Sequence, residues 1–169
     1  MRAGPRGIVG AVLGAAAGGG RRRALAGDIR DQGASAVFAE SFVKIGLIPD
    51  WGGHYLLTRL VGASQAMELM MLGDRIDAET ALRLGLVNAV FSDDSFRERV
   101  IEKAIALAAV PREAIALIKH GVIDGSTGSL DQTLAYEMDA QRKVFLSEDA
   151  REGINAFLEK RAPVFGQKP

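Results

Sequence analysis

One carboxylate in this sequence, Asp50, stands among residues that suit proton transfer. It lies in the stretch 45–62 (IGLIPDWGGHYLLTRLVG), directly between Pro49 and Trp51, and two glycines follow. Proline fixes its own φ and lacks an N–H donor, and glycine permits tight backbone geometry. We expect an acid in this position, at the start of a helix, to be partly desolvated, which makes a carboxylate a better proton shuttle near neutral pH. A simpler interpretation stays open: Asp50 caps the helix that begins around Gly52, because Asp is a favoured N-cap residue.

A second candidate for chemistry is the glycine triplet at 18–20. It could be a flexible connection or a loop that binds phosphate through backbone N–H groups. No Gly-Lys-Ser/Thr follows, so it does not match a P-loop, and its spacing does not fit G-x-G-x-x-G. Glycine also lets a substrate carbonyl approach the main chain closely, where fixed N–H donors stabilise developing negative charge.

The spacing of apolar residues predicts strands and helices that would position these candidates. The expected elements are a strand at 8–13, a helix start at 21–26, a strand at 36–39, helices at 51–60 and 63–72 broken at Gly62, a helix opened by Asp77, a strand at 86–91, and helices from Asp93 almost to the end. Apolar stripes are formed by Phe96, Val100, Ala104, Leu107 and Ala108, and by Leu130, Leu134, Met138 and Phe145. The pattern predicts an α/β fold with a helix-rich C-terminal half.

The composition excludes several classes of protein. A chain of 169 residues suits one domain, and such a domain buries about 70% of its unfolded surface. Lys and Arg number 21 and Asp and Glu number 21, so no net field favours nucleic acid or an acidic membrane. The absence of cysteine excludes a disulfide scaffold, a thiol nucleophile and a Cys-ligated metal. We expect neither His54 nor His120 to have the i, i+4 partner or the acidic neighbour of a zinc helix, so we interpret both as helix-face residues and expect no metal site.

The N-terminus does not match an export signal. Arg2 and Arg6 precede an apolar run at 8–17, which is half of the roughly 20 residues that a spanning helix needs. The glycines inside that run, and the arginines at 21–23, argue against cleavage after the Ala-Leu-Ala at 24–26. We expect a cytoplasmic protein that does not bind membranes.

Several motifs, in their order and separation, resemble the crotonase superfamily of enoyl-CoA hydratases and isomerases. They are the glycine-rich stretch 10–20, the stretch 24–29 (ALAGDI), the Asp50 stretch, the stretch 73–87 and the stretch 148–161 (EDAREGINAFLEKR). The resemblance covers residues 7–165 and implies a ClpP/crotonase-like fold. The Pro-Asp-x-Gly element is similar to that of the ring-opening isomerases of phenylacetate degradation. The family's N-terminal region has no counterpart here, so we expect a fold truncated at its N-terminus. Residues 1–92 would form a partial crotonase core with the oxyanion and catalytic segments, and residues 93–169 a helical oligomerisation region.

The resemblance assigns catalytic roles. The backbone N–H of Gly19 corresponds to a donor that holds the thioester oxygen as an enolate forms. The two glutamates of hydratase members correspond to Arg22 and Phe42, neither of which can act as an acid–base pair. Asp50 stands where several isomerase members place their catalytic acid. One carboxylate is enough to move a proton between two carbons, so the resemblance favours an isomerase that shifts a double bond.

Two alternatives stay open. An enoyl-CoA hydratase, which is a lyase, would need another acid; Glu40 would share a face with Phe42 if this segment were a strand. A catalytically inactive crotonase-like fragment that associates with full-length subunits would bind a thioester without turnover.

The resemblance also implies the ligand. The substrate would be an acyl-CoA thioester of fatty acid or phenylacetate metabolism, and no cofactor is expected, since coenzyme A is part of the substrate. Gly18, Gly20 and Trp51 would lie beside it, while Phe157 would contact the adenine and Lys160 a phosphate of a neighbouring subunit's CoA. The simpler interpretation is an ordinary amphipathic helix with a buried Phe157 and a solvated Lys160. Members of the family form homotrimers or hexamers, and the C-terminal helices suit such packing.

Charged residues occupy two segments that are a helix face or an apolar strand in the family, at 21–23 and at Arg30-Asp31-Gln32. Such charges are seldom buried without partners. We expect a solvated face for the arginines; a bidentate grip on CoA phosphates is the alternative.

Overall fold

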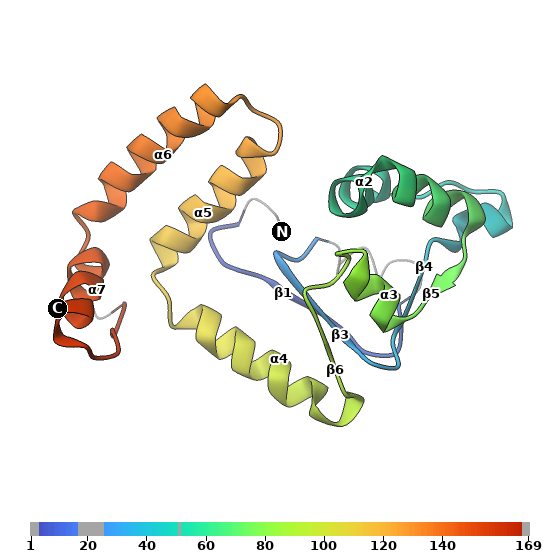
Figure 1. Ribbon diagram of the computed structural model, residues 1–169, viewed down its shortest axis with the longest axis horizontal. Coiled ribbons are helices and arrows are strands. Elements are labelled where there is room, and N and C mark those ends of the chain that lie inside the picture. The colour runs from blue at the N-terminus through green and yellow to red at the C-terminus, as the bar shows by residue number, and fades with distance from the viewer. Residues whose placement is uncertain (1–3, 17–25, 51, 167–169) are drawn as a thin grey trace. The chain divides into compact units, whose positions relative to one another are not determined.

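The structure, a computed structural model, describes residues 4–16, 26–50 and 52–166 (Figure 1). The chain divides into two units, one spanning Ile8–Lys103 and one joining Ala104–Pro169 to the segment Arg2–Gly7. The predicted functional division into 1–92 and 93–169 stays a prediction. No described helix is both long enough and apolar enough to cross a bilayer.

The elements follow the predicted order closely. In the first unit they are β1 (Val9–Val12), β2 (Ala15–Ala16), β3 (Ile29–Gly33), β4 (Val37–Ala39), the 3₁₀ helix η1 (Ser41–Ile45), α2 (Gly53–Leu72), β5 (Arg75–Ile76), α3 (Ala78–Arg83) and β6 (Ala89–Phe91). The remaining helices are α4 (Asp93–Ala108), α5 (Arg112–Gly125), α6 (Leu130–Phe145) and α7 (Glu148–Glu159). The strands expected at 8–13, 36–39 and 86–91 are confirmed as β1, β4 and β6. The helix start expected at 21–26 lies outside the described residues, apart from its last position.

Two small sheets form the strand framework of the first unit (Figure 1). One is parallel, with β3 between β1 and β6. The other has β4 between β2, which is parallel to it, and β5, which is antiparallel. The chain passes from β1 to β2 through Gly14, whose φ of 76° is a left-handed conformation that glycine adopts without strain.

The residue pattern did not predict the central strand β3, because its sequence Ile-Arg-Asp-Gln-Gly is polar, although the resemblance implies a strand there. Its polar side chains are buried or half-buried with partners. Asp31 is 0% exposed, and its Oδ1 lies 2.6 Å from the Nζ of Lys103. Gln32 is also buried and donates to the carbonyl of Ala36 at 2.7 Å. Arg30 is half-buried rather than on a solvated face, which corrects that expectation, and its Nε donates to the carbonyl of Leu86 at 2.7 Å.

Helix α2 supplies most of the apolar core of this unit. Its buried Leu57, Ala66 and Leu69 pack with residues from β4, α3 and the loop before β6, namely Phe38, Ala81 and Leu86. The predicted break is confirmed, since Gly62 has φ 79° and ψ 164° inside α2.

Helix α3 begins as predicted at Asp77, which caps it. The Asp77 side chain accepts a hydrogen bond from the Thr80 N–H at 2.8 Å. That bond favours the charged carboxylate and lowers the pKa of Asp77.

The second unit contains antiparallel neighbours α5 and α6, followed by α7 (Figure 1). Helix α6 begins at a capping box, in which Ser129 and Gln132 bond to each other's backbone N–H. The Tyr136 hydroxyl donates to the Leu117 carbonyl at 2.7 Å and so joins α6 to α5. Lys119 is buried as a residue, and its ammonium donates to the carbonyl of Arg6 at 2.9 Å, which fixes the N-terminal segment against α5.

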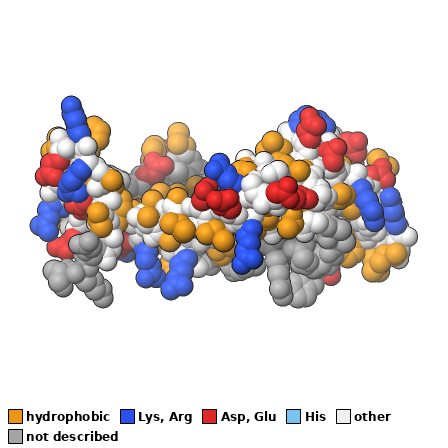
Figure 2. Space-filling view, turned by 90° about the horizontal axis from the view of Figure 1, so that it is seen from below, with side chains coloured by type: hydrophobic (Ala, Val, Ile, Leu, Met, Phe, Trp, Pro, Cys, Tyr) orange, Lys and Arg blue, Asp and Glu red, His pale blue; other side chains and the backbone are white. Residues whose placement is uncertain are grey.

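Many large apolar side chains of the second unit remain exposed. The whole predicted stripe on α6 is exposed by half or more, comprising Leu130, Leu134, Met138 and Phe145. Figure 2 shows such hydrophobic side chains at the surface among charged ones. Exposed apolar area on this scale is typical of surfaces that pack against something else.

Candidate functional site

The segment that carries Asp50 is a tight connection between β4 and α2. The 3₁₀ helix η1 ends at Gly46, whose φ is 72°, and the Leu47 N–H donates back to the Phe42 carbonyl at 3.0 Å. Pro49 is buried, and a Cβ added at Gly53 would lie 3.1 Å from the Pro49 Cβ. A glycine at 53 therefore lets the first turn of α2 approach the proline, and this contact fixes the backbone on either side of Asp50.

Asp50 itself lies just before the N-terminus of α2. Its carbonyl accepts a hydrogen bond from the Gly53 N–H at 3.0 Å. The N-cap position belongs to Gly52, with φ 82°, and not to Asp50. The Asp50 side chain is exposed in this chain, so the expected partial desolvation is not present here.

An apolar strip leads to this carboxylate. Ile45 is 72% exposed, Leu47 56% and Ile48 74%. Three large hydrophobic side chains in solvent, next to one acid, form a surface that would contact an apolar ligand and desolvate the acid in doing so. Sequence reasoning singled out Asp50 but did not expect Ile45, Leu47 and Ile48 to be exposed.

Glu40, the acid considered as a substitute, is placed differently from expectation. Its side chain is 1% exposed, at the end of β4. Phe42 belongs to η1 and is half-buried, so the shared parity expected for two residues of one strand is wrong. The glycine triplet 18–20, Arg22 and Trp51 lie outside the described residues, and their roles stay predictions.

The other predicted pair, Phe157 and Lys160, lies at the C-terminal end of α7. Phe157 is 82% exposed, so the simpler interpretation with a buried phenylalanine is wrong. Lys160 follows the helix with φ 55°, and is the one non-glycine residue with positive φ in the described ranges. The Arg161 N–H donates to the Ala156 carbonyl at 3.0 Å and the Lys160 N–H to the Phe157 carbonyl at 3.3 Å. These bonds define a Schellman C-cap, which normally has glycine where Lys160 stands.

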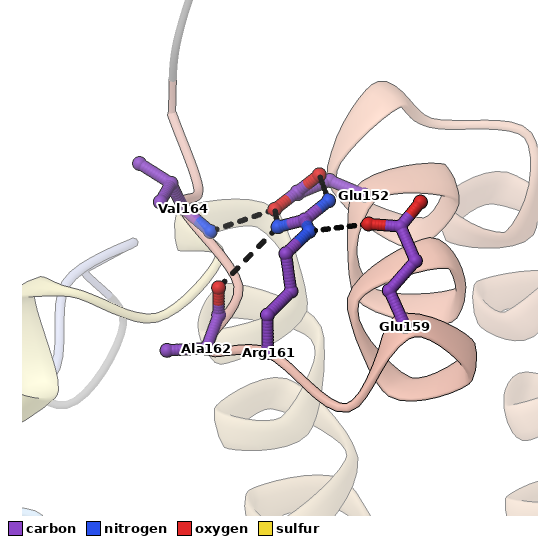
Figure 3. Close-up of polar contacts among 5 residues, drawn as sticks. All are labelled: Glu152, Glu159, Arg161, Ala162 and Val164. Atoms are coloured by element: carbon purple, nitrogen blue, oxygen red, sulfur yellow. Dashed lines mark hydrogen bonds and ion pairs between the residues drawn. The ribbon is translucent and has the colours of Figure 1, made fainter.

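A cluster of charges surrounds this C-cap, and we call it the Arg161 clasp (Figure 3). The Arg161 guanidinium donates to both oxygens of Glu152, at 2.6 and 2.9 Å, and to Glu159 at 2.6 Å. The Val164 N–H donates to the same Glu152 carboxylate at 2.9 Å. The guanidinium beside it lowers the pKa of Glu152 to about 2, and the two carboxylates raise the pKa of Arg161. Both residues belong to the C-terminal motif, but sequence reasoning gave neither of them a role.

Further hollows in the second unit are apolar. One, of about 760 Å³, lies between α5 and α6 and is lined by residues including Leu117, Val122 and Val144. Another, of about 540 Å³, is bordered by α7 and includes Phe157 in its lining.

His54 lies in α2 and His120 in α5. In the described residues no group of three or more His, Cys, Asp or Glu side chains is placed to hold an ion. His120 stacks on Tyr136, with ring centroids 5.3 Å apart. Its Nδ1 lies 3.1 Å from Asp124, one turn further along the helix, so the expectation that neither histidine has an acidic neighbour is wrong. His54 is an exposed residue of α2.

Solved structures show the same fold. The chain superposes on an enoyl-CoA hydratase/isomerase from Cupriavidus metallidurans CH34 with a TM-score of 0.89, at 33% sequence identity, over 98% of this chain and 63% of that one. The fold is therefore that of the ClpP/crotonase class, as predicted.

Sequence comparison gives the family. The enoyl-CoA hydratase/isomerase family model matches residues 1–168. The 1,2-epoxyphenylacetyl-CoA isomerase of Escherichia coli K12 is 42% identical over 164 residues, and crotonyl-CoA hydratase of Syntrophomonas wolfei is 35% identical over 161 residues. The chain belongs to the enoyl-CoA hydratase/isomerase family. It spans 63% of the length of the first relative, covering 97% of its own residues, and 62% of the second, covering 95%.

Proposed function

We propose that this chain carries the proton-transfer site of an acyl-CoA isomerase, with Asp50 as the acid–base group. The observation that supports it is the exposed carboxylate at the end of an apolar strip. The resemblance adds that Phe42 and Arg22 stand where hydratase members have their glutamates. An acyl chain that covers Ile45, Leu47 and Ile48 would remove Asp50 from water. The 42% identity to 1,2-epoxyphenylacetyl-CoA isomerase also favours isomerase over hydratase.

The proposed reaction is a proton shift along a bound 3-enoyl thioester. The Asp50 carboxylate removes a proton from C2, the C2–H electrons form an enolate conjugated with the double bond, and the thioester oxygen takes the negative charge. The backbone N–H of Gly19 would hold that oxygen, as fixed donors do where charge develops. The Asp50 carboxylic acid then returns the proton to C4, and the double bond lies between C2 and C3. The step balances without water, metal or redox partner, so the proposal includes no cofactor beyond the CoA of the substrate.

The remaining sites in the proposal bind the rest of the substrate. Gly18, Gly20 and Trp51 would line the acyl thioester. Phe157 and Lys160 would bind the nucleotide end of CoA in a neighbouring subunit, which the exposure of Phe157 supports.

Assembly into a homotrimer or hexamer is the proposed state of the protein. The exposed α6 stripe supports it, because a stripe at helical spacing with nothing over it suits packing against another subunit.

Isotope exchange tests the chemistry. The chain is incubated with 2-enoyl-CoA and 3-enoyl-CoA in deuterium oxide, and the masses of the products are measured by mass spectrometry. We expect deuterium incorporation and double-bond migration, and a loss of about 10²–10⁴-fold in rate for Asp50→Asn, the usual contribution of a general acid–base group. Asp94→Asn, an exposed acid in the first turn of α4, is the matched control and should change nothing.

Two outcomes would contradict the proposal. Gain of one water by 2-enoyl-CoA would show hydratase chemistry, and its loss in Glu40→Gln would assign the acid to Glu40. Binding of either thioester without exchange or turnover would show an inactive fragment.

A further inference from the structure

The backbone at Lys160 is strained. A φ of 55° is a left-handed conformation in which an L side chain is crowded by the backbone, and glycine is the usual residue there. Strained residues persist where the surrounding structure holds them, and they cluster at functional sites. The other described residues with positive φ, six between β1 and β6 and Gly166 near the C-terminus, are all glycines. A lysine at this position therefore implies a role for its side chain and surrounding contacts that hold its strained backbone.

The Arg161 clasp is that structure. Arg161, the residue after Lys160, pairs with Glu152 of α7. The same guanidinium pairs with Glu159, the residue before Lys160. The Val164 N–H bond to Glu152 and the Gly166 N–H bond to Asp149, both 2.9 Å, continue the attachment along the C-terminal segment. The backbone is thus fixed on both sides of the strained residue (Figure 3).

The side chains of Lys160 and Phe157 are both exposed. Its ammonium pairs with no carboxylate among the described residues, although Glu159 and Glu152 are near in sequence, because both are engaged by Arg161. Phe157 lies one turn earlier on α7 and is 82% exposed. An exposed ammonium three residues after an exposed aromatic ring suits a ligand with a flat base and an anionic group.

We propose that Arg161 is a positioning residue for the nucleotide end of an acyl-CoA ligand. It holds the left-handed turn at Lys160 and occupies the neighbouring carboxylates, so that Phe157 and Lys160 present a ring and a free cation together. This inference rests on the proposed function for the identity of the ligand. Arg161 itself touches no ligand; it acts through the conformation and the charge of Lys160.

The test distinguishes an effect on binding of the nucleotide from an effect on the reacting acyl group. The full chain and its Arg161→Met, Arg161→Lys and Arg151→Met variants are compared for the dissociation constant of free CoA. They are also compared for the KM and kcat of an enoyl-CoA and of the matching N-acetylcysteamine thioester, which lacks the nucleotide. Arg151 is the matched control, since it forms an exposed pair with Glu148 on the same helix at 3.0 Å. Thermal unfolding of each variant reports whether it is folded.

For Arg161→Met we expect the CoA dissociation constant and the KM for enoyl-CoA to rise about tenfold, which corresponds to losing one charge-assisted contact. The kcat, and both constants for the nucleotide-free thioester, should be unchanged. The dissociation constant and KM of Arg161→Lys should lie between those of the parent and of Arg161→Met, because a lysine supplies charge without the bidentate contact. Arg151→Met should match the parent.

Three results would overturn the inference. They are unchanged CoA binding in Arg161→Met, an equal loss for both thioesters, and a parent chain that does not bind CoA. A parent chain that binds CoA without turnover contradicts the proposed isomerase alone, and the CoA dissociation constants then still decide the role of Arg161.

Discussion

Two ion pairs of equal length lie in opposite surroundings. In the first unit, Asp31 and Lys103 approach to 2.6 Å, with side-chain exposures of 0% and 29%. In the second unit, Glu152 and Arg161 also approach to 2.6 Å, with exposures of 25% and 41%. The first pair joins the central strand β3 to α4, and the second joins α7 to the chain that follows it.

Distance alone therefore does not set the role of an ion pair. A buried carboxylate has lost its hydration, so its partner is needed to keep the folded state stable, whereas an exposed pair is screened and contributes little to stability. The other oxygen of Asp31, Oδ2, has no hydrogen-bond partner in the part of the chain that the structure describes, so Asp31 depends on the Lys103 contact. The Arg161 clasp instead fixes local geometry, which is the role proposed for it above.

The largest expected effect is that of removing Lys103. Lys103→Met should lower the free energy of unfolding by roughly 3 kcal/mol, the lower end of the range for breaking a buried pair, because Asp31 would stay buried without its partner. Denaturant titration followed by circular dichroism measures this change.

The control for this prediction is an exposed pair of the same unit. Lys44 and Asp74 lie 3.0 Å apart with exposures of 53% and 65%. Lys44→Met should cost at most about 1 kcal/mol. Equal costs for Lys44→Met and Lys103→Met would mean that burial of Asp31 does not distinguish the two pairs.

A second prediction removes both charges of the buried pair. Asp31→Val combined with Lys103→Met should bring stability back to within about 1 kcal/mol of the parent, because apolar replacement of a buried pair is often neutral or stabilising. Valine also suits a central strand. The four-member cycle of parent, two single variants and the double variant isolates the coupling between the residues. If the double variant loses as much stability as the sum of the single variants, the pair is not coupled.

Sequence reasoning located elements whose apolar residues follow a simple period. The break of α2 at Gly62, the cap at Asp77 and the helices after Asp93 were all predicted, because local glycine and capping chemistry determines them. It missed β3, whose burial depends on a lysine 72 positions further along the chain. No local pattern shows that Asp31 has such a partner.

For the candidate site, too, the sequence identified residues but not the geometry around them. Asp50 and Phe157 were identified from motifs, and the structure adds that both are exposed. The strain at Lys160 could not be predicted, since it depends on a backbone angle rather than on residue type. The Arg161 clasp lay within a motif already noted, yet its geometry requires the chain to turn back after α7.

Relief of that strain should be visible as a gain in stability. A left-handed L residue costs roughly 1–2 kcal/mol and the extra freedom of an unfolded glycine costs about 0.5–1, so Lys160→Gly should stabilise the chain by roughly 0.5–1 kcal/mol. Lys160→Ala, which keeps the Cβ and removes the ammonium, should bring no such gain. Urea midpoints of the two variants measure the difference. An equal gain in both would assign the effect to the charge and not to the backbone.

The smallest expected effect is the pH dependence of the exposed clasp. The pKa of Glu152 is lowered from 4.5 to about 2 in the folded chain, chiefly by its hydrogen bond to Arg161. A carboxylate with a lowered pKa contributes stability that is fully present above its unfolded value and is lost as the pH falls through its folded value. The difference in unfolding temperature between the parent and Arg161→Met should therefore be constant at neutral pH and shrink between pH 4.5 and about 2. The guanidinium stays charged throughout, because its pKa is raised by the same contacts. A difference that persists unchanged down to pH 2 would show that packing of the arginine stem, rather than its ion pair with Glu152, holds the end of α7.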